Sequence, residues 1–297
     1  MKHLDTFKDI AKQISSATGR HFKPLTTQPV AGGDINSAFR LQGSDQSYFV
    51  KLNRPQLLPM FEAEQAGLQE LAAAKTLRIP LPTVSGKTKD HAFLVIEYIA
   101  WGANTNATSR LLGQQLALMH QSQQAYFGWH RDNTIGSTPQ INTQNADWPT
   151  FWRDQRLGFQ LNLAKDNGYG GRLQSLGEQL CGYISIFFNN YHPTPSLLHG
   201  DLWGGNTAVD QQGQPVIFDP ACYYGDRETD LAMTELFGGF DRNFYAAYQS
   251  AWPLDQGFST RKILYNLYHI LNHLNLFGGG YLRQAENMLA KLLSEIK

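Results

Sequence analysis

A short segment rich in glycine, acidic and amide residues has the residue types and spacing needed for phosphoryl transfer. It reads HGDLWGGN over residues 199–206, and a second aspartate, Asp219, follows an apolar run farther along. In kinases one aspartate accepts the proton of the attacking hydroxyl, while an asparagine and another aspartate hold the metal ions that bridge the phosphates. We therefore take Asp201 as the candidate catalytic base, and Asn206 and Asp219 as candidate ligands of Mg²⁺.

The chain between these residues reads as a β-hairpin, which would bring them together. Two strand-like stretches, residues 207–210 and 215–218, flank a QQGQ turn. Because a hairpin holds its two ends close, Asn206 and Asp219 are expected to lie near each other. A few oxygen ligands from protein, completed by phosphate and water, suit Mg²⁺. An aspartate after a strand is often only a helix cap, so it is the ordered combination that favours a metal and phosphate site.

The first third of the chain supplies candidates for binding nucleotide phosphates. Lys51 ends an apolar strand, where a lysine can reach the phosphates. Glu64 lies thirteen residues later on an expected helix and could hold that lysine by an ion pair. Glu62 lies about 200° away around the helix, so only one of the two can face the site, and we favour Glu64. Gly32 and Gly33 form a turn whose backbone amides could contact phosphates, although a plain hairpin turn explains them equally well.

Three residues at the end of the β-rich region are candidates for contacting a nucleotide base. Glu97, Tyr98 and Ile99 follow the apolar strand at residues 93–96, where the chain crosses into helical territory. Their backbone carbonyl and amide groups could pair with the edge of adenine. This assignment depends on position alone, because backbone pairing leaves little trace in side-chain identity.

These candidate residues require a sheet in the first third of the chain and helices beyond it. Strand-like segments separated by glycine turns occupy residues 30–53 and 93–96. Apolar periodicity predicts most of the helices. They are expected at residues 4–14, 60–75, 111–121, 148–160, 177–191 and 261–277. The pattern predicts an α+β chain with an antiparallel-sheet lobe over residues 1–99 and a mainly helical lobe over residues 100–297.

The composition excludes several classes of protein. The 297 residues include 25 Lys+Arg and 25 Asp+Glu, so the net charge of zero argues against a basic nucleic-acid binder. A hydrophobic fraction of 42% argues against disorder. The two cysteines, Cys181 and Cys222, form no CxxC pair, and no apolar run reaches the roughly 18 residues of a membrane span. We expect a cytoplasmic protein with no nucleic-acid or membrane partner; the sequence does not indicate an oligomeric state.

Several motifs together resemble the fructosamine kinase (ketosamine 3-kinase) family, a branch of the protein-kinase-like fold shared with aminoglycoside and choline phosphotransferases. The resemblance runs almost from end to end. Its carriers include GGDINSAFRL, YFVKLN, LVIEYI, LLHGDLWGGN, VIFDPACYYGDRETDLAMTELFGGF and LYHILNHLNLFGGGYL. The tryptophan inside HGDLWGGN and the NHLNLFGGGY segment are the most family-specific parts, whereas the HGD, Asn and Asp core is common to the wider superfamily.

The resemblance implies a bilobal kinase-like fold and a specific reaction. ATP, with Mg²⁺, would phosphorylate the 3-hydroxyl of a ketosamine, such as fructosamine, ribulosamine or erythrulosamine carried on a small amine or on a protein lysine. The product then decomposes and frees the amine, which implies a deglycation repair role. By matching position, Asp201, Asn206, Asp219, Lys51 and Glu64 keep the roles given above. Trp203 is expected to line the acceptor site, because an aromatic face suits an ammonium group.

Two alternative functions remain open at this point. A phosphotransferase for another hydroxylated small molecule, such as an aminoglycoside or a choline-like compound, would use the same fold, and fold does not fix substrate. A pseudokinase that only binds nucleotide would lack at least one of Lys51, Asp201, Asn206 and Asp219, but all four are present.

Other residues of possible interest have simpler interpretations. Asp230, at the start of an expected helix, would brace the catalytic loop by accepting backbone N–H groups. His269 and His273 have the i,i+4 spacing of a metal pair, but the surrounding apolar run favours packing or lining of the substrate cleft. Trp101 is expected, with most other aromatic residues, to belong to the core.

Overall fold

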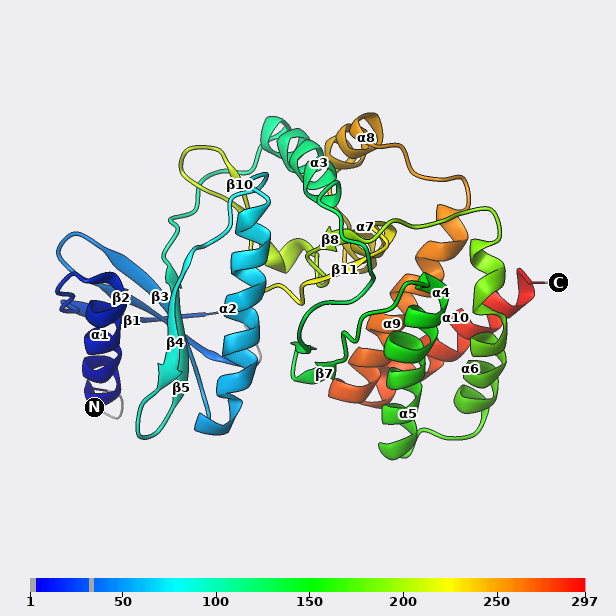
Figure 1. Cartoon of the computed structure of the whole chain (residues 1–297), viewed down its shortest axis with the longest axis horizontal. Coiled ribbons are helices and arrows are strands. Elements are labelled where there is room, and N and C mark those ends of the chain that lie inside the picture. The colour runs from blue at the N-terminus through cyan, green and yellow to red at the C-terminus, as the bar shows by residue number, and fades with distance from the viewer. Residues whose placement is uncertain (1–3, 32–34, 297) are drawn as a thin grey trace.

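The computed structural model describes residues 4–31 and 35–296. Its N-terminal lobe is built on a five-stranded antiparallel sheet of order β1-β2-β3-β5-β4 (Figure 1). The strands are β1 (Thr26–Val30), β2 (Ser37–Gln42), β3 (Ser47–Asn53), β4 (Pro82–Lys87) and β5 (Ala92–Glu97). Strand β2 pairs with β1 on one side and with β3 on the other, and both pairs are antiparallel.

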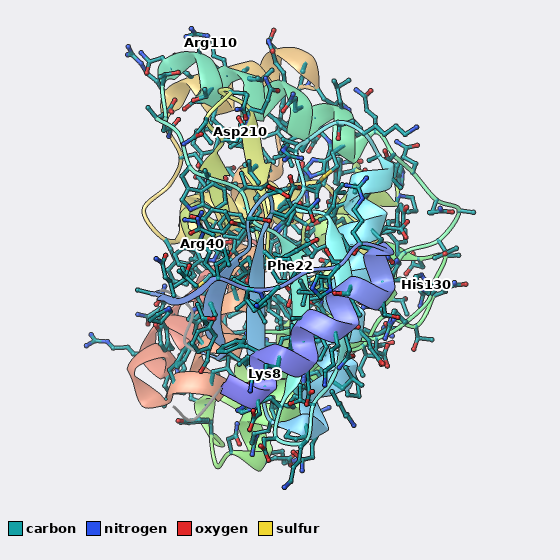
Figure 2. All side chains as sticks on the ribbon, turned by 90° about the vertical axis from the view of Figure 1, so that its left-hand side faces the viewer. Lys8, Phe22, Arg40, Arg110, His130 and Asp210 are labelled. Carbon is teal, nitrogen blue, oxygen red and sulfur yellow. The ribbon has the colours of Figure 1, made fainter. Side chains whose placement is uncertain are left out.

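One helix covers each face of this sheet. Helix α1 (Leu4–Thr18) lies across the strands in Figure 2, and α2 (Leu58–Ala73) packs on the opposite face. Strand β5 is continuously apolar because both of its faces are buried. Phe93 and Val95 pack with α1, whereas Leu94 and Ile96 join the larger core cluster that contains α2. The sheet therefore holds Lys51 of β3 on a backbone that is supported from both sides.

The C-terminal lobe is mainly helical. Its helices are α3 (Asn106–His120), α4 (Trp148–Trp152), α5 (Gly158–Asp166), α6 (Arg172–Tyr183), α7 (Glu228–Leu236), α8 (Arg242–Ala251), α9 (Phe258–Phe277) and α10 (Leu282–Ser294). Figure 1 shows α9 running through this lobe with α5, α7 and α10 around it. Apolar residues along nearly every turn bury α9 on most sides, as expected for a central helix.

Three small two-stranded sheets in this lobe carry and support the candidate catalytic segments. Strands β9 (Thr207–Val209) and β10 (Pro215–Ile217) form the expected hairpin, with Ile217 opposite Thr207. Strands β8 (Ser196–Leu198) and β11 (Tyr223–Gly225) pair just outside it. Strands β6 (Asn133–Ile135) and β7 (Thr138–Gln140) form a third hairpin nearby. The chain thus enters and leaves the HGDLWGGN segment through hydrogen-bonded strands.

The α+β, two-lobe architecture is confirmed, and each of the six expected helices overlaps an observed one. The helix expected at residues 148–160 is divided between α4 and α5, which the wider helical turn Arg153–Leu157 separates. The helix expected at residues 177–191 begins earlier and ends as an α-helix at Tyr183. Strand β4 was not expected, because two prolines at its start obscure its pattern. The glycine turn at Gly32 and Gly33 lies outside the described residues. Across the described part of the chain, none of the helices has the length and apolarity to cross a bilayer.

Candidate active site

A buried lysine joins the two lobes at the centre of the site. Lys51 Nζ lies 2.5 Å from Glu64 Oε1 and 2.5 Å from Asp219 Oδ1. Burial alone would lower the pKa of Lys51, but the carboxylates of Asp219 and Glu64 raise it above its ordinary value. Glu64 makes this ion pair, while Glu62 on the same helix is exposed. The lysine is therefore a fixed cation placed where phosphate groups would meet Asp219.

Asp201 and Asn206 lie together in the loop before the hairpin. Asn206 Nδ2 donates to the backbone carbonyl of Asp201 at 2.8 Å and to Asp201 Oδ2 at 3.2 Å. Loss of water around Asp201 and the nearby charge of Asp219 raise the pKa of Asp201 to about 7, against the opposing effect of the Asn206 hydrogen bond. A carboxyl group with a pKa near neutrality is suited to general-base catalysis.

Asp230, at the start of α7, braces this loop as the sequence predicts. Its carboxylate accepts the backbone N–H of His199 at 2.7 Å and that of Gly200 at 2.8 Å. His120 Nε2 is 3.2 Å from the same carboxylate. Burial raises the pKa of Asp230, but these hydrogen bonds and charges outweigh it and leave the pKa below its usual range. Asp230 therefore remains an anion that fixes the backbone just before Asp201.

The backbone after the hairpin approaches the catalytic loop too closely for side chains. Gly200 has φ +82°, and a Cβ built there would lie 2.1 Å from the carbonyl oxygen of Ala221. Asp219 itself has φ +57°, which is uncommon for a residue other than glycine. Such a conformation persists only where the surroundings hold it, and here it turns the Asp219 carboxylate toward Lys51.

Buried amide side chains hold the residues that follow Asp219. Gln140 Nε2 donates to the Ala221 carbonyl at 3.0 Å, and Asn133 Nδ2 donates to the Cys222 carbonyl at 2.8 Å. Gln140 also donates to Asn133 Oδ1 and accepts a hydrogen bond from the Tyr268 hydroxyl at 2.8 Å. We call Asn133, Gln140 and Tyr268 the amide clamp. Because these groups are buried and paired, they fix the segment that carries Asp219.

The connection between the lobes is held by an arginine that sequence reasoning missed. Arg78 forms ion pairs with Glu97 and with Asp210. The Asp210 carboxylate also accepts the backbone N–H groups of Gln212 and Gln214 in the hairpin turn. The carbonyl of Arg78 accepts the N–H of Ile217 at 3.2 Å. Arg78 thereby ties the end of β5 to the β9–β10 hairpin, where Figure 2 labels Asp210.

The three candidate base-contacting residues lie at this connection. The side chain of Glu97 is engaged by Arg78, and its backbone N–H donates to the carbonyl of Leu81 at 2.8 Å. The Arg40 guanidinium lies 4.2 Å from the centre of the Tyr98 ring, and Ile99 is buried. These side chains and the Glu97 N–H are already engaged or buried, so a base could contact only the remaining backbone N–H and carbonyl groups of residues 97–99.

Trp203 is at one end of a row of aromatic rings. Its ring centre is 6.2 Å from that of Phe237, which is 4.8 Å from the ring of His273. His273 also lies 5.2 Å from the ring of Tyr281. Trp203 is 38% exposed, so part of the indole remains accessible beside Asp201. We call Trp203, Phe237, His273 and Tyr281 the aromatic row.

The donor set near Asp219 fits a hard divalent cation. Asp219, Asp201 and Asn206 offer carboxylate and amide oxygens, and the Asp219 side chain is 44% exposed. The crowding of negative charge that helps to raise the pKa of Asp201 is what a cation would relieve. Within residues 4–31 and 35–296, no group of three or more His, Cys, Asp or Glu side chains could hold a metal. Phosphate and water would therefore complete the coordination.

Two simpler interpretations have different outcomes. Trp101 does not belong to the core as expected; it is 53% exposed and lies where the chain leaves β5. His273 Nδ1 is 2.8 Å from the carbonyl of His269, which is the ordinary packing of a helix histidine and agrees with the non-metal interpretation. Asn133 and Gln140 gave no sequence signal, because isolated amides in short segments look like loop residues.

Comparison with known proteins agrees with this geometry. The chain matches the fructosamine kinase family over residues 6–295. A Synechocystis protein named a ketoamine kinase is 47% identical over 288 residues, which cover 97% of each chain. The chloroplastic protein-ribulosamine 3-kinase of Arabidopsis thaliana is 42% identical and covers 90% of this chain and 82% of its own length. A crystal structure from Haemophilus somnus, assigned as a fructosamine-3-kinase, has a TM-score of 0.88 at 28% identity over 97% of each chain. Matches of this extent include both lobes and the whole site, so the chain belongs to the fructosamine kinase family.

Proposed function

We propose that this protein transfers the γ-phosphoryl group of ATP to the 3-hydroxyl of a ketosamine. The observation that carries the proposal is the joining of Lys51, Glu64 and Asp219 beside Asp201 and Asn206, in a chain that matches this family over nearly its full length. The names of the ketoamine kinase and ribulosamine 3-kinase relatives support the ketosamine as the acceptor class. The pseudokinase alternative loses support because none of the expected polar groups is missing.

In this proposal each polar residue has one role. Asp201 accepts the proton of the attacking hydroxyl, and its hydrogen bond from Asn206 holds the carboxylate in place. Lys51, oriented by Glu64, holds the phosphates of ATP, while Asn206 and Asp219 hold Mg²⁺. When bound, Mg²⁺ would neutralise charge on the phosphates. Gly32 and Gly33 are proposed to cover the phosphates, and the backbone of Glu97, Tyr98 and Ile99 to contact the base.

The acceptor is proposed to bind against Trp203 and the rest of the aromatic row. A ketosamine carries hydroxyl groups and an ammonium, and a cation over an aromatic face is stabilised by about 0.5–2 kcal/mol. Trp203 is 38% exposed, and the amine of the acceptor is proposed to be either a small amine or a protein lysine. Because the phosphorylated product decomposes and frees the amine, the proposed role is the removal of sugar adducts. The proposed location is the cytoplasm, and the proposed lobes are residues 1–99 and 100–297.

ATP consumption against a panel of acceptors tests this function. The panel contains fructosyl-, ribulosyl- and erythrulosyl-lysine, together with choline and kanamycin. We expect turnover with at least one ketosamine and none with choline or kanamycin, and no turnover by Asp201→Asn. Turnover with kanamycin or choline would favour the other phosphotransferase alternative, and inactivity with every acceptor would favour the pseudokinase alternative.

A further inference from the structure

An exposed tryptophan lies between the connection of the lobes and the metal-binding aspartate. Trp101 is 53% exposed, and its ring is stacked on Phe218 with centres 5.6 Å apart and planes at 22°. Phe218 directly precedes Asp219, and Trp101 lies two residues beyond Ile99. The stacked pair therefore connects the proposed base-contacting segment to the residue that faces the phosphates.

The backbone that carries this indole is held against strand β9 and the hairpin turn. Trp101 forms an antiparallel bridge with Asp210, and the next residue, Gly102, donates its N–H to the Val209 carbonyl at 2.7 Å. A Cβ on Gly102 would lie 2.3 Å from the carbonyl oxygen of Asp210, so this close approach requires glycine. Arg78, which pairs with Asp210, adds a further tie. The indole is therefore an exposed aromatic surface on a backbone that the hairpin holds in place, next to the proposed base-contacting segment.

We propose that Trp101 is a nucleotide-binding residue whose indole, backed by Phe218, provides the flat surface against which the purine base of ATP packs. The expected orientation of ATP in the site supports this proposal. Its phosphates belong at Lys51 and Asp219, so its base extends from there toward residues 97–99, past the Trp101–Phe218 stack. Every nucleobase has a flat π-face, and stacking on an aromatic side chain is worth enough to raise affinity by about five- to 150-fold. The inference rests on the placement of the base in the proposed function.

Calorimetric titration with ADP and Mg²⁺, without any acceptor, tests this role. We expect Trp101→Ala to weaken ADP binding at least about fivefold and Trp101→Phe to stay within about twofold of the wild type, because a phenyl ring keeps the flat face. Tyr183→Ala is the matched control, since Tyr183 is 45% exposed on α6, and its ADP affinity should be unchanged. Because no ketosamine is present, the result is independent of whether the proposed acceptor is correct.

A second probe separates stacking from a structural role. Inorganic tripolyphosphate has no base, so its affinity should be the same for the wild type and Trp101→Ala. Equal losses for ADP and tripolyphosphate, unchanged ADP binding, or tighter ADP binding by Trp101→Ala would each overturn the inference. If Trp101→Ala does not fold, iodide quenching in Trp203→Phe replaces it, because this change leaves Trp101 as the exposed tryptophan of the described chain. ADP should then protect the emission from quenching, and absence of protection would contradict the proposal.

Discussion

Lys51 and Asp219 are 168 positions apart in the sequence, yet Lys51 Nζ lies 2.5 Å from Asp219 Oδ1. The lysine belongs to the third strand of the N-terminal lobe, and the aspartate follows the hairpin of the C-terminal lobe. Their contact means that the cation proposed to bind phosphates and the carboxylate proposed to bind Mg²⁺ are already in place relative to each other. Glu64 contacts the same ammonium at 2.5 Å, so Lys51 has a second carboxylate partner from its own lobe.

Loss of Glu64 should therefore impair catalysis through the position of Lys51. We expect Glu64→Gln to lower kcat/KM for ATP by on the order of 10²-fold, because displacement of a positioning group by about 1 Å can cost that much. Steady-state kinetics with ATP varied is the measurement. Glu62→Gln is the matched control on the same helix and should behave like the wild type, since Glu62 is exposed. Equal effects of the two changes would argue against the ion pair as the cause.

Asp201 and Asp219 should differ in what they affect. Asp201→Asn removes the proton acceptor, so kcat should fall by about 10²–10⁴-fold, while binding of ADP with Mg²⁺ stays near the wild-type value. Asp219→Ala removes a metal ligand and should abolish the dependence of ADP affinity on Mg²⁺. Isothermal titration with and without Mg²⁺ measures both. An Asp201→Asn enzyme with near-wild-type turnover would remove the assignment of the base.

The close approach of Gly200 to Ala221 can be tested against a glycine of similar backbone conformation. Gly200 and Gly213 have φ +82° and +78°, but a Cβ on Gly213 would meet nothing within 4 Å. Each change to alanine costs about 1–2 kcal/mol of left-handed strain. Gly213→Ala should show that cost alone and remain active. Gly200→Ala should also displace the loop that carries Asp201 and lose most activity. Thermal unfolding measures the loss of stability from strain, and kcat measures the effect of the displaced loop. An active Gly200→Ala enzyme would show that the loop tolerates displacement.

Stability should depend on pH through His269. Burial is the main cause that lowers the pKa of His269, to about 3, with smaller effects from His273, Arg156 and Asp230. The unfolded chain takes up a proton near pH 6.5 while the folded chain does not, so this contribution to stability is present above pH 6.5 and is lost as the pH falls toward 3. At pH 5.5 the loss is about 1.4 kcal/mol.

Urea unfolding of the wild type and of His269→Gln at pH 7.5 and pH 5.5 measures this contribution. The difference between the two proteins is the relevant quantity, because Glu228, whose pKa burial raises to about 7, changes stability in the opposite sense in both. The wild type should lose about 1.4 kcal/mol more than the variant on acidification. An identical pH dependence in the two proteins would show that folding does not lower the pKa of His269.

Much of the fold and the paired groups of the site could be predicted, because they depend on local spacing. The hairpin between Asn206 and Asp219, the strand that ends at Lys51 and the helix that carries Glu64 all leave periodic or ordered patterns. Asp230 was predicted for a similar reason, since it follows Asp219 by a short, glycine-containing stretch.

The missing parts depend on contacts between distant segments. Arg78 has no motif of its own, and its importance comes from two carboxylates that folding brings to it. Gln140 and Asn133 matter because they meet backbone carbonyl groups more than 80 positions away, and such contacts leave no periodicity. Trp101 was misjudged because tryptophan is usually buried, and only the tertiary structure shows that its indole is exposed.

The amide clamp has a consequence for inhibition. In protein kinases the segment after the metal aspartate can change its packing between active and inactive states. Here the corresponding carbonyls of Ala221 and Cys222 accept hydrogen bonds from Gln140 and Asn133, and the Ala221 N–H donates to His199. An inhibitor that binds only when Asp219 has moved out of the site would require these three buried hydrogen bonds to break. Drug-like molecules against this enzyme should therefore compete for the nucleotide or acceptor surfaces instead of trapping a rearranged backbone.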